Sequence, residues 1–278
     1  MLTILRRLNP DWGKQDNPGL SSREDKMRRT RNWQLSVLIL ACLLLTPFTP
    51  KADTLHLTAV YWPPYAGPTL PEQGAAVYVI KKALSAMGHE VKVDFYGAGR
   101  ASKLVGKSGS KYLGYLPVYE YQNSDFVFSK PVATSPIGLV EMKLHPLSWL
   151  EMDDLRNFTL GVGPQVLGIP EVSPWLESDK QPKREATSDL QNIRMVATAR
   201  VDGAVMDMNV AEYLLKSDSL PGVSSKLQFG RRLLAEPSLF VAFQRSEEGR
   251  RWLDILNQGL NTLDTQALLN AYWRELNN

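Results

Sequence analysis

A single carboxylate, Asp207, stands directly after a short apolar run and directly before a helical one. Residues 201–206 are too few and too apolar for a helix, and they are typical of a buried strand. Residues 210–216 have helical spacing, so Asp207 lies at the carboxyl end of a strand, where open α/β sheets bind ligands. A carboxylate there can accept hydrogen bonds from a cationic or hydroxylated ligand. The alternative is that Asp207 only caps the helix.

A second candidate is an aromatic loop that prolines stiffen. The loop follows a predicted strand at residues 55–60 and carries Tyr61, Trp62 and Tyr65 around two adjacent prolines. Because prolines reduce the entropy that a loop loses on meeting a ligand, these rings can clamp a small molecule by stacking or cation–π contact. The alternative is that the rings pack onto the body of the domain.

Further polar and aromatic candidates lie on neighbouring segments. Tyr115 and Tyr119 belong to a predicted strand at residues 112–119, which ends in an aromatic loop. Arg100 lies near the start of a short predicted helix. This arginine is either a surface charge or a hydrogen-bond donor to an anion near the mouth of a cleft.

A glycine-rich turn at residues 161–168 follows a predicted strand and contains Gln165. Such a turn can point backbone N–H groups at an anion, but it lacks the Gly-Lys-Ser/Thr ending of a phosphate loop. The three histidines show neither metal-ligand spacing nor pairing with a nucleophile. The sequence therefore implies no metal and no cofactor.

The first 52 residues are predicted to be a leader that contains a secretory signal peptide. An apolar run at residues 35–45 follows several arginines and precedes Ala52, a small residue at the expected cleavage site. The run is short for a membrane span, which needs ~20 residues. In one alternative translation starts at Met27, and in another Cys42, the only cysteine, carries a lipid. The leader predicts a periplasmic protein, whose mature part would contain no thiol.

The basic charge of the chain belongs to this leader. Residues 1–52 hold nine Lys or Arg and four Asp or Glu, a net +5, which leaves −2 for the rest of a chain whose net charge is +3. A slightly acidic mature protein has no electrostatic footprint for nucleic acid. We therefore expect no nucleic-acid partner.

The remaining pattern alternates strands and helices, as in α/β proteins. A change of character around residues 137–150 indicates a domain boundary. Further predicted strands are residues 91–96, 126–132, 138–142, 158–162 and 239–243, and further predicted helices are residues 74–87, 97–105, 193–197, 247–263 and 265–276.

The order and spacing of four motifs resemble the type 2 periplasmic solute-binding proteins, in the polar amino-acid branch (extracellular solute-binding protein family 3). The motifs are residues 126–131, 154–162, 201–207 and 256–260. The resemblance covers the chain from Leu55 to its end. It implies a two-lobed periplasmic-binding-protein-like fold, in which two α/β lobes joined by two hinge strands close on a ligand.

Carried onto this chain, the resemblance places the first lobe at residues 53–137 plus 243–278 and the second lobe at residues 138–242. The hinge strands would be residues 138–140 and 239–241.

The site departs from the family at two places. Family members carry an arginine, in a Thr-x-x-Arg-like loop, that pairs with the α-carboxylate of an amino acid, and Gln122 stands at that position here. A neutral amide cannot form that charge-assisted pair. Pro164 also removes one N–H donor from the glycine-rich turn. Asp207 matches the family's acceptor for the ligand amino group. These residues predict a cation, an amine, a polyol or an aromatic small molecule as ligand.

The sequence thus predicts a monomeric periplasmic binding protein. Its partners would be a small-molecule ligand and either an ABC permease or a membrane sensor. One alternative is an enzyme on the same fold, such as a dehydratase, for which Glu120, Asp207 and Arg100 are the available groups. The other is a protein that kept the fold, lost the ligand and contacts another protein.

Overall fold

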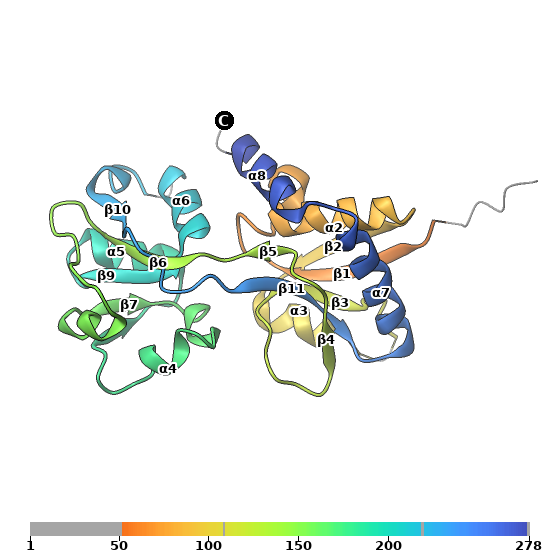
Figure 1. Ribbon diagram of the computed structural model, residues 1–278, viewed down its shortest axis with the longest axis horizontal. Coiled ribbons are helices and arrows are strands. Elements are labelled where there is room, and N and C mark those ends of the chain that lie inside the picture. Colours follow the sequence, from red (N-terminus) through yellow and green to blue (C-terminus); the bar gives the residue numbers. More distant parts are fainter. Residues whose placement is uncertain (1–51, 108, 218–219, 277–278) are drawn as a thin grey trace, which may run out of the picture. The chain divides into compact units, whose positions relative to one another are not determined.

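The computed structural model describes residues 52–278 apart from residues 108, 218–219 and 277–278. The predicted leader, with Met27 and Cys42, lies outside the described residues except for Ala52. Two β-sheets organise the described chain, and we call the elements around them the first and the second lobe (Figure 1). Over the described residues, no helix is both long enough and apolar enough to cross a membrane.

The sheet of the first lobe has six strands, in the order β2-β1-β3-β11-β4 with β5 also paired to β11. Strand β1 pairs in parallel with β2 and β3, and β11 runs antiparallel to β3, β4 and β5. The alternating residues Leu55, Leu57 and Ala59 of β1 are fully buried, as the period-2 pattern predicts. The strands are β1 (Thr54–Val60), β2 (Glu90–Tyr96), β3 (Gly114–Val118), β4 (Phe126–Phe128), β5 (Ala133–Thr134) and β11 (Ser238–Gln244).

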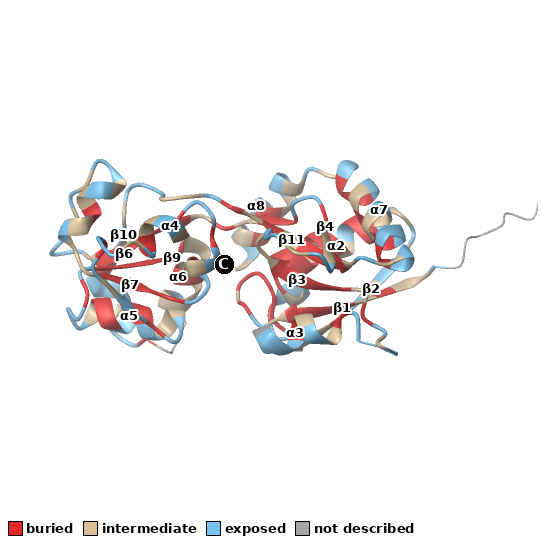
Figure 2. Cartoon of the chain, turned by 90° about the horizontal axis from the view of Figure 1, so that it is seen from below, coloured by how far each residue is buried: buried red, intermediate tan, exposed pale blue. Residues whose placement is uncertain are grey.

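Helices cover both faces of this sheet (Figure 2). Helix α2 packs on the two C-terminal helices and buries Val77, Ile80 and Leu84, the apolar stripe that the sequence shows. Helix α3 lies on the other face, where the buried hydroxyl of Thr58 donates to the carbonyl of Ala101 at 2.9 Å. The helices are α2 (Ala75–Ala86), α3 (Ala98–Leu104), α7 (Glu247–Asn261) and α8 (Thr265–Leu276), and a 3-10 turn, η1 (Pro71–Gln73), precedes α2.

The sheet of the second lobe has five strands in the order β10-β6-β9-β7-β8. Strands β7, β8 and β9 are parallel, and β6 runs antiparallel to β9. The strands are β6 (Ile137–Met142), β7 (Leu160–Val162), β8 (Lys183–Glu185), β9 (Gly203–Asp207) and β10 (Leu227–Phe229). The helices are α4 (Ser173–Leu176), α5 (Asp189–Ala197) and α6 (Met208–Lys216), with 3-10 turns η2 (Met152–Asn157), η3 (Val166–Gly168) and η4 (Ser224–Lys226).

Two segments carry the chain between the sheets, and they are hydrogen-bonded to each other. The amide of Ser135 donates to the carbonyl of Pro237 at 2.9 Å, and the amide of Ile137 donates to the carbonyl of Ala235 at 2.8 Å. In Figure 1 these segments run side by side from β5 to β6 and into β11. Strand β11 begins at Ser238 and pairs only with first-lobe strands. The predicted division at residues 137/138 and 242/243 stays a proposal.

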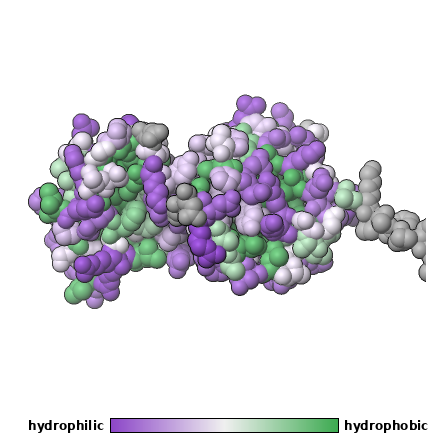
Figure 3. All heavy atoms as spheres, turned by 90° about the horizontal axis from the view of Figure 1, so that it is seen from above, coloured by the Kyte–Doolittle hydropathy of each residue, from purple (hydrophilic) through white to green (hydrophobic). Residues whose placement is uncertain are grey.

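Buried residues lie along the strands and on the helix faces that pack against the sheets, whereas the outer faces of the helices are exposed (Figure 2). On the face that Figure 3 shows, hydrophilic and hydrophobic residues are interspersed over both lobes.

Gly259 in helix α7 belongs to the motif at residues 256–260, and its place in the fold requires a glycine. A Cβ atom at this position would lie 2.2 Å from the carbonyl oxygen of Ala83 in α2, a distance that only glycine allows. In contrast, a Cβ atom on Gly99 in helix α3 would meet no atom within 4 Å. Glycine at position 259 therefore lets two helices approach closely.

We expect Gly259→Ala to lower the free energy of unfolding by about 1–3 kcal/mol, because α2 and α7 must move apart. The control Gly99→Ala is expected to raise it by about 0.5–1 kcal/mol, because alanine favours a helix. Urea unfolding of both variants measures this difference. Equal stabilities would contradict the close helix packing.

Candidate functional site

Side chains from both lobes meet at the carboxyl ends of the sheet strands. Trp62 and Tyr65 follow β1, Tyr119 follows β3, and Asp207 is the last residue of β9. Ser135 joins them from the first crossing segment. We call these five residues the interlobe cluster.

Asp207 is buried, and hydrogen bonds from both lobes saturate its carboxylate. It caps helix α6, because its Oδ1 accepts from the amide of Val210 at 2.9 Å. Its Oδ2 accepts from the phenol of Tyr65 at 2.7 Å and from the hydroxyl of Ser135. Only 5% of Asp207 is exposed. The carboxylate therefore has protein donors on both oxygens.

Tyr65 ties the first lobe to the second at two points. Its hydroxyl donates to Asp207 and accepts from Nδ2 of Asn209 in α6 at 2.8 Å. The carbonyl of Thr134 also lies 2.9 Å from it, but a phenol has one proton, and the carboxylate is the stronger acceptor. The main chain of Tyr65 packs closely against Gly74. A Cβ atom at position 74 would lie 2.4 Å from the Tyr65 carbonyl oxygen, so only glycine fits there.

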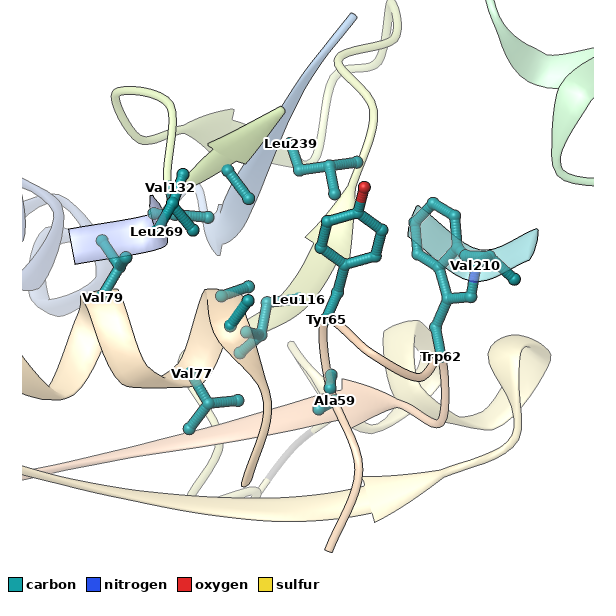
Figure 4. Packing of buried hydrophobic residues seen from close by; sticks show 14 of the residues in the cluster. Ala59, Trp62, Tyr65, Val77, Val79, Leu116, Val132, Val210, Leu239 and Leu269 are labelled. Carbon is teal, nitrogen blue, oxygen red and sulfur yellow. The ribbon is translucent and has the colours of Figure 1, made fainter. Parts of the chain in front are cut away.

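The aromatic rings of the interlobe cluster pack on one another. The Trp62 ring centroid lies 5.3 Å from that of Tyr65 and 5.7 Å from that of Tyr119. Trp62 and Tyr65 belong to the same hydrophobic cluster as Val210 of α6 (Figure 4). Because the proton of Ser135 goes to Asp207, the Tyr119 hydroxyl donates to Ser135, at 2.8 Å. The buried Nε1 of Trp62 has no hydrogen-bond partner among the described residues.

Burial is the largest influence on the pKa values of Asp207, Tyr65 and Tyr119. Burial raises the pKa of Asp207 to about 6, although the hydrogen bonds from Ser135, Tyr65 and Val210 act in the opposite direction. The pKa of Tyr65 is raised by burial and by the charge of Asp207. Burial, followed by the charge of Asp207, likewise raises the pKa of Tyr119. Both phenols are therefore neutral donors at physiological pH.

Asp189 is a carboxylate near Tyr119 that the sequence analysis did not single out. It is the first residue of helix α5, directly after the cap Ser188, and burial raises its pKa to about 6. A Cβ atom on Gly163 would lie 3.3 Å from an oxygen of Asp189 and 3.4 Å from the amide oxygen of Gln165. The side chains of Asp189 and Gln165 thus both lie close to Gly163 in the glycine-rich turn. The available signal was the Ser-Asp pair before a helical stretch, which is a helix-start pattern.

A cavity of about 850 Å³ is lined by Tyr119 of the interlobe cluster, but Asp207 does not line it. Residues of both lobes and of the second crossing segment form its walls. We call it the aromatic cavity after the five rings that line it, Tyr119, Tyr121, Phe126, Phe128 and Phe240.

The charged lining of the aromatic cavity is mainly acidic. Glu120, Glu171 and Glu236 line it together with one cation, Arg245. Nη2 of Arg245 donates to the carbonyl of Phe126 at 2.9 Å. The neutral Gln122 also lines the cavity.

The nine predicted site residues fall into separate groups. Trp62, Tyr65, Tyr119 and Asp207 come together in the interlobe cluster. Tyr119 also lines the aromatic cavity, as does Gln122. Gln165 lies next to Gly163, as does Asp189.

The remaining three predicted residues do not line the aromatic cavity. Tyr61 is 57% exposed. The guanidinium of Arg100 lies over the ring of Tyr96 at 5.2 Å. Tyr115 is buried beneath the cavity, where its hydroxyl lies 2.5 Å from that of Tyr121. Of the three groups that an enzyme would use, only Glu120 lines the cavity.

Comparison with solved structures finds many similar folds. A histidine kinase sensor domain similar to periplasmic binding proteins matches with a TM-score of 0.62 and 16% identity, over 80% of this chain and 95% of that one. The GluR0 ligand-binding core from Nostoc punctiforme in complex with L-glutamate matches with a TM-score of 0.58 and 16% identity, over 80% and 98%. The substrate binding protein of an amino acid ABC transporter matches with a TM-score of 0.56 and 13% identity, over 80% and 98%.

This chain has the two-lobed fold of periplasmic binding proteins. The predicted fold class is therefore confirmed. Neither the comparison with protein families nor that with curated proteins finds a match. The structural matches establish the fold of the chain. Because the sequence identities are low, the ligand has to be inferred from the site itself.

We expect Tyr65→Phe to lower the free energy of unfolding by about 1–3 kcal/mol, because the buried Asp207 loses a donor and Asn209 loses its acceptor. The control is Tyr78→Phe in helix α2, whose half-buried ring contacts Tyr272. We expect this control to change stability by less than about 0.5 kcal/mol. Thermal and urea unfolding measure both variants, and a Tyr65→Phe protein as stable as Tyr78→Phe would contradict the assignment.

The pKa of Asp189 makes stability depend on pH. Because its pKa rises from 3.8 to about 6 on folding, the folded state holds the proton more tightly. This contribution is present below pH 4 and is lost as pH rises through 6. The raised pKa of Asp207 likewise makes the free energy of unfolding fall as pH rises. We expect Asp189→Asn to reduce the loss of stability between pH 4 and pH 7 by on the order of 1–3 kcal/mol.

The matched control for this pH series is Asp179→Asn, which alters an exposed carboxylate. Its stability should follow that of the parent protein at every pH. If Asp189→Asn loses as much stability as the parent between pH 4 and pH 7, Asp189 is not desolvated.

Proposed function

We propose that the chain is a non-enzymatic, small-molecule-binding module of the periplasmic-binding-protein type. It acts in the periplasm, holds a small polar or cationic and aromatic molecule between its lobes, and serves either an ABC permease or a membrane sensor. The observation that carries this proposal is the aromatic cavity, whose walls come from both lobes and from the crossing segment. A ligand in such a place contacts both lobes and can stabilise one arrangement of them.

The chemistry of the cavity supports binding over catalysis. Its volume of about 850 Å³ lies in the range of small-molecule sites, ~300–1,000 Å³. Catalysis by general acid and base needs two groups that face the same reacting atom. Among the charged residues that line the cavity, Glu120, Glu171 and Glu236 are acidic and Arg245 is engaged with a main-chain carbonyl.

The solved relatives support both branches of the proposal. One is named as the substrate binding protein of an amino acid ABC transporter, and another as a histidine kinase sensor domain. These descriptions concern those proteins, and the aromatic cavity differs from a site for a zwitterionic amino acid because Gln122 lines it.

A second candidate function is a ligand-independent interaction module. The specific observation in its favour is the interlobe cluster, in which Asp207 and Tyr65 already join the lobes through protein hydrogen bonds. Such contacts can hold the lobes together without a ligand, and a partner protein would then recognise a permanently closed domain.

A thermal-shift screen decides between the two candidates. The panel contains amines, quaternary ammonium compounds, polyols, aromatic acids and amino acids, tested on the full chain. We expect at least one compound to stabilise the protein, by ~2.7 kcal/mol at 100 times its dissociation constant. Binding of each hit is then confirmed by equilibrium dialysis. A panel without any hit would contradict the first candidate and favour the second.

A further inference from the structure

The carboxylate that matches the amino-group acceptor of binding proteins is not open to a ligand in this chain. Asp207 receives hydrogen bonds from Tyr65, Ser135 and Val210, and Trp62 and Tyr119 pack around them. An ammonium group that entered here would have to displace two hydroxyl donors and separate the packed rings. The protein therefore needs another place for a ligand.

The aromatic cavity supplies ring faces at that other place. The rings of Tyr121 and Phe128 lie 5.4 Å apart at 72°, and those of Phe128 and Phe240 lie 6.3 Å apart at 69°. Successive rings that stand nearly perpendicular form the corners of a box. Tyr121 is 41% exposed although its ring contacts Phe128, so part of it is free for a ligand. A box of this kind attracts a cation, because the ring faces are electron-rich.

The charges around the box favour a cation over an anion. No ion pair engages Glu120, Glu171 or Glu236 within the described part of the chain. The only cation of the lining, Arg245, donates to a main-chain carbonyl. A carboxylate ligand would meet three acids and a single cation, Arg245, because Gln122 is neutral, so the lining carries a net negative charge.

Carboxylates of the second lobe also make the surroundings of Tyr119 negative. Tyr119 is the ring that belongs both to the aromatic cavity and to the interlobe cluster. The nearby carboxylates there are Asp207, Asp189 and Glu171. A positive charge placed next to Tyr119 is therefore attracted from the second lobe as well as from the box.

We infer that the aromatic cavity is the ligand site of this protein and that it takes a small organic cation with apolar substituents, such as a quaternary or alkylated ammonium. This inference rests on the proposed function and adds the location and the chemical class of the ligand. The ring faces contact the alkyl groups of the cation, and the glutamates that line the cavity favour a positively charged ligand.

Titration of the full chain with choline and with its neutral isostere 3,3-dimethyl-1-butanol tests the inference. We expect choline to bind at least about tenfold more tightly, because only the cation gains from the rings and the glutamates. Tyr121→Leu should weaken choline binding by about 2- to 30-fold. Glu171→Gln should weaken choline binding and leave the isostere unaffected.

The matched control is Phe229→Leu on strand β10, which removes an aromatic ring of similar exposure, 39%, outside the cavity. It should bind choline as the parent does. The inference is overturned if choline does not bind, if both probes bind equally, or if Tyr121→Leu matches Phe229→Leu. A compound of another class that binds while choline does not would overturn only this inference, and the proposed function would stand.

Discussion

The structure depends on one buried carboxylate whose hydrogen bonds come from both lobes. Asp207 ends the central strand of the second sheet, caps the following helix, and accepts from a phenol of the first lobe and from a hydroxyl of the crossing segment. A buried carboxylate without donors is very costly, so these contacts constrain where Tyr65 and Ser135 lie. Because they link residues 142 positions apart in the sequence, the same contacts tie the two lobes together.

This constraint separates two roles that one site could otherwise combine. The interlobe cluster joins the lobes through neutral phenols and a desolvated carboxylate, with Trp62 and Tyr119 filling the space. The aromatic cavity beside it keeps ring surface and three carboxylates that form no ion pair with any described residue. Tyr119 belongs to both groups, so a ligand in the cavity would act directly on a residue that touches both lobes.

Much of the fold could be predicted from hydrophobic periodicity. Strand β9 with Asp207 at its end, the amphipathic helix α2 and the two C-terminal helices lie close to where their patterns indicate. The three-residue strands β8 and β10 were missed, because Lys183–Glu185 and Leu227–Phe229 have no alternation long enough to read. Their pairing with neighbouring strands, a tertiary effect, makes them strands.

The candidate site was less accessible to sequence reasoning. The sequence marks Asp207 and the aromatic loop as functional candidates, but it cannot show that Tyr65 and Ser135 both donate to Oδ2 of Asp207, because these contacts join distant segments. Helix α5 begins at Asp189, four residues before the predicted start, so the desolvated carboxylate at its first turn was overlooked. The box of Tyr121, Phe128 and Phe240 likewise arises only when β4 and β11 pair.

The most direct test of the central claim is a double-mutant cycle between Tyr65→Phe and Asp207→Ala, measured by the free energy of unfolding. If the phenol and the carboxylate are direct partners across the lobes, the two changes are non-additive, with a coupling energy of about 1.5–3 kcal/mol. A coupling energy near zero would show that Asp207 acts only as the cap of helix α6 and would contradict the account.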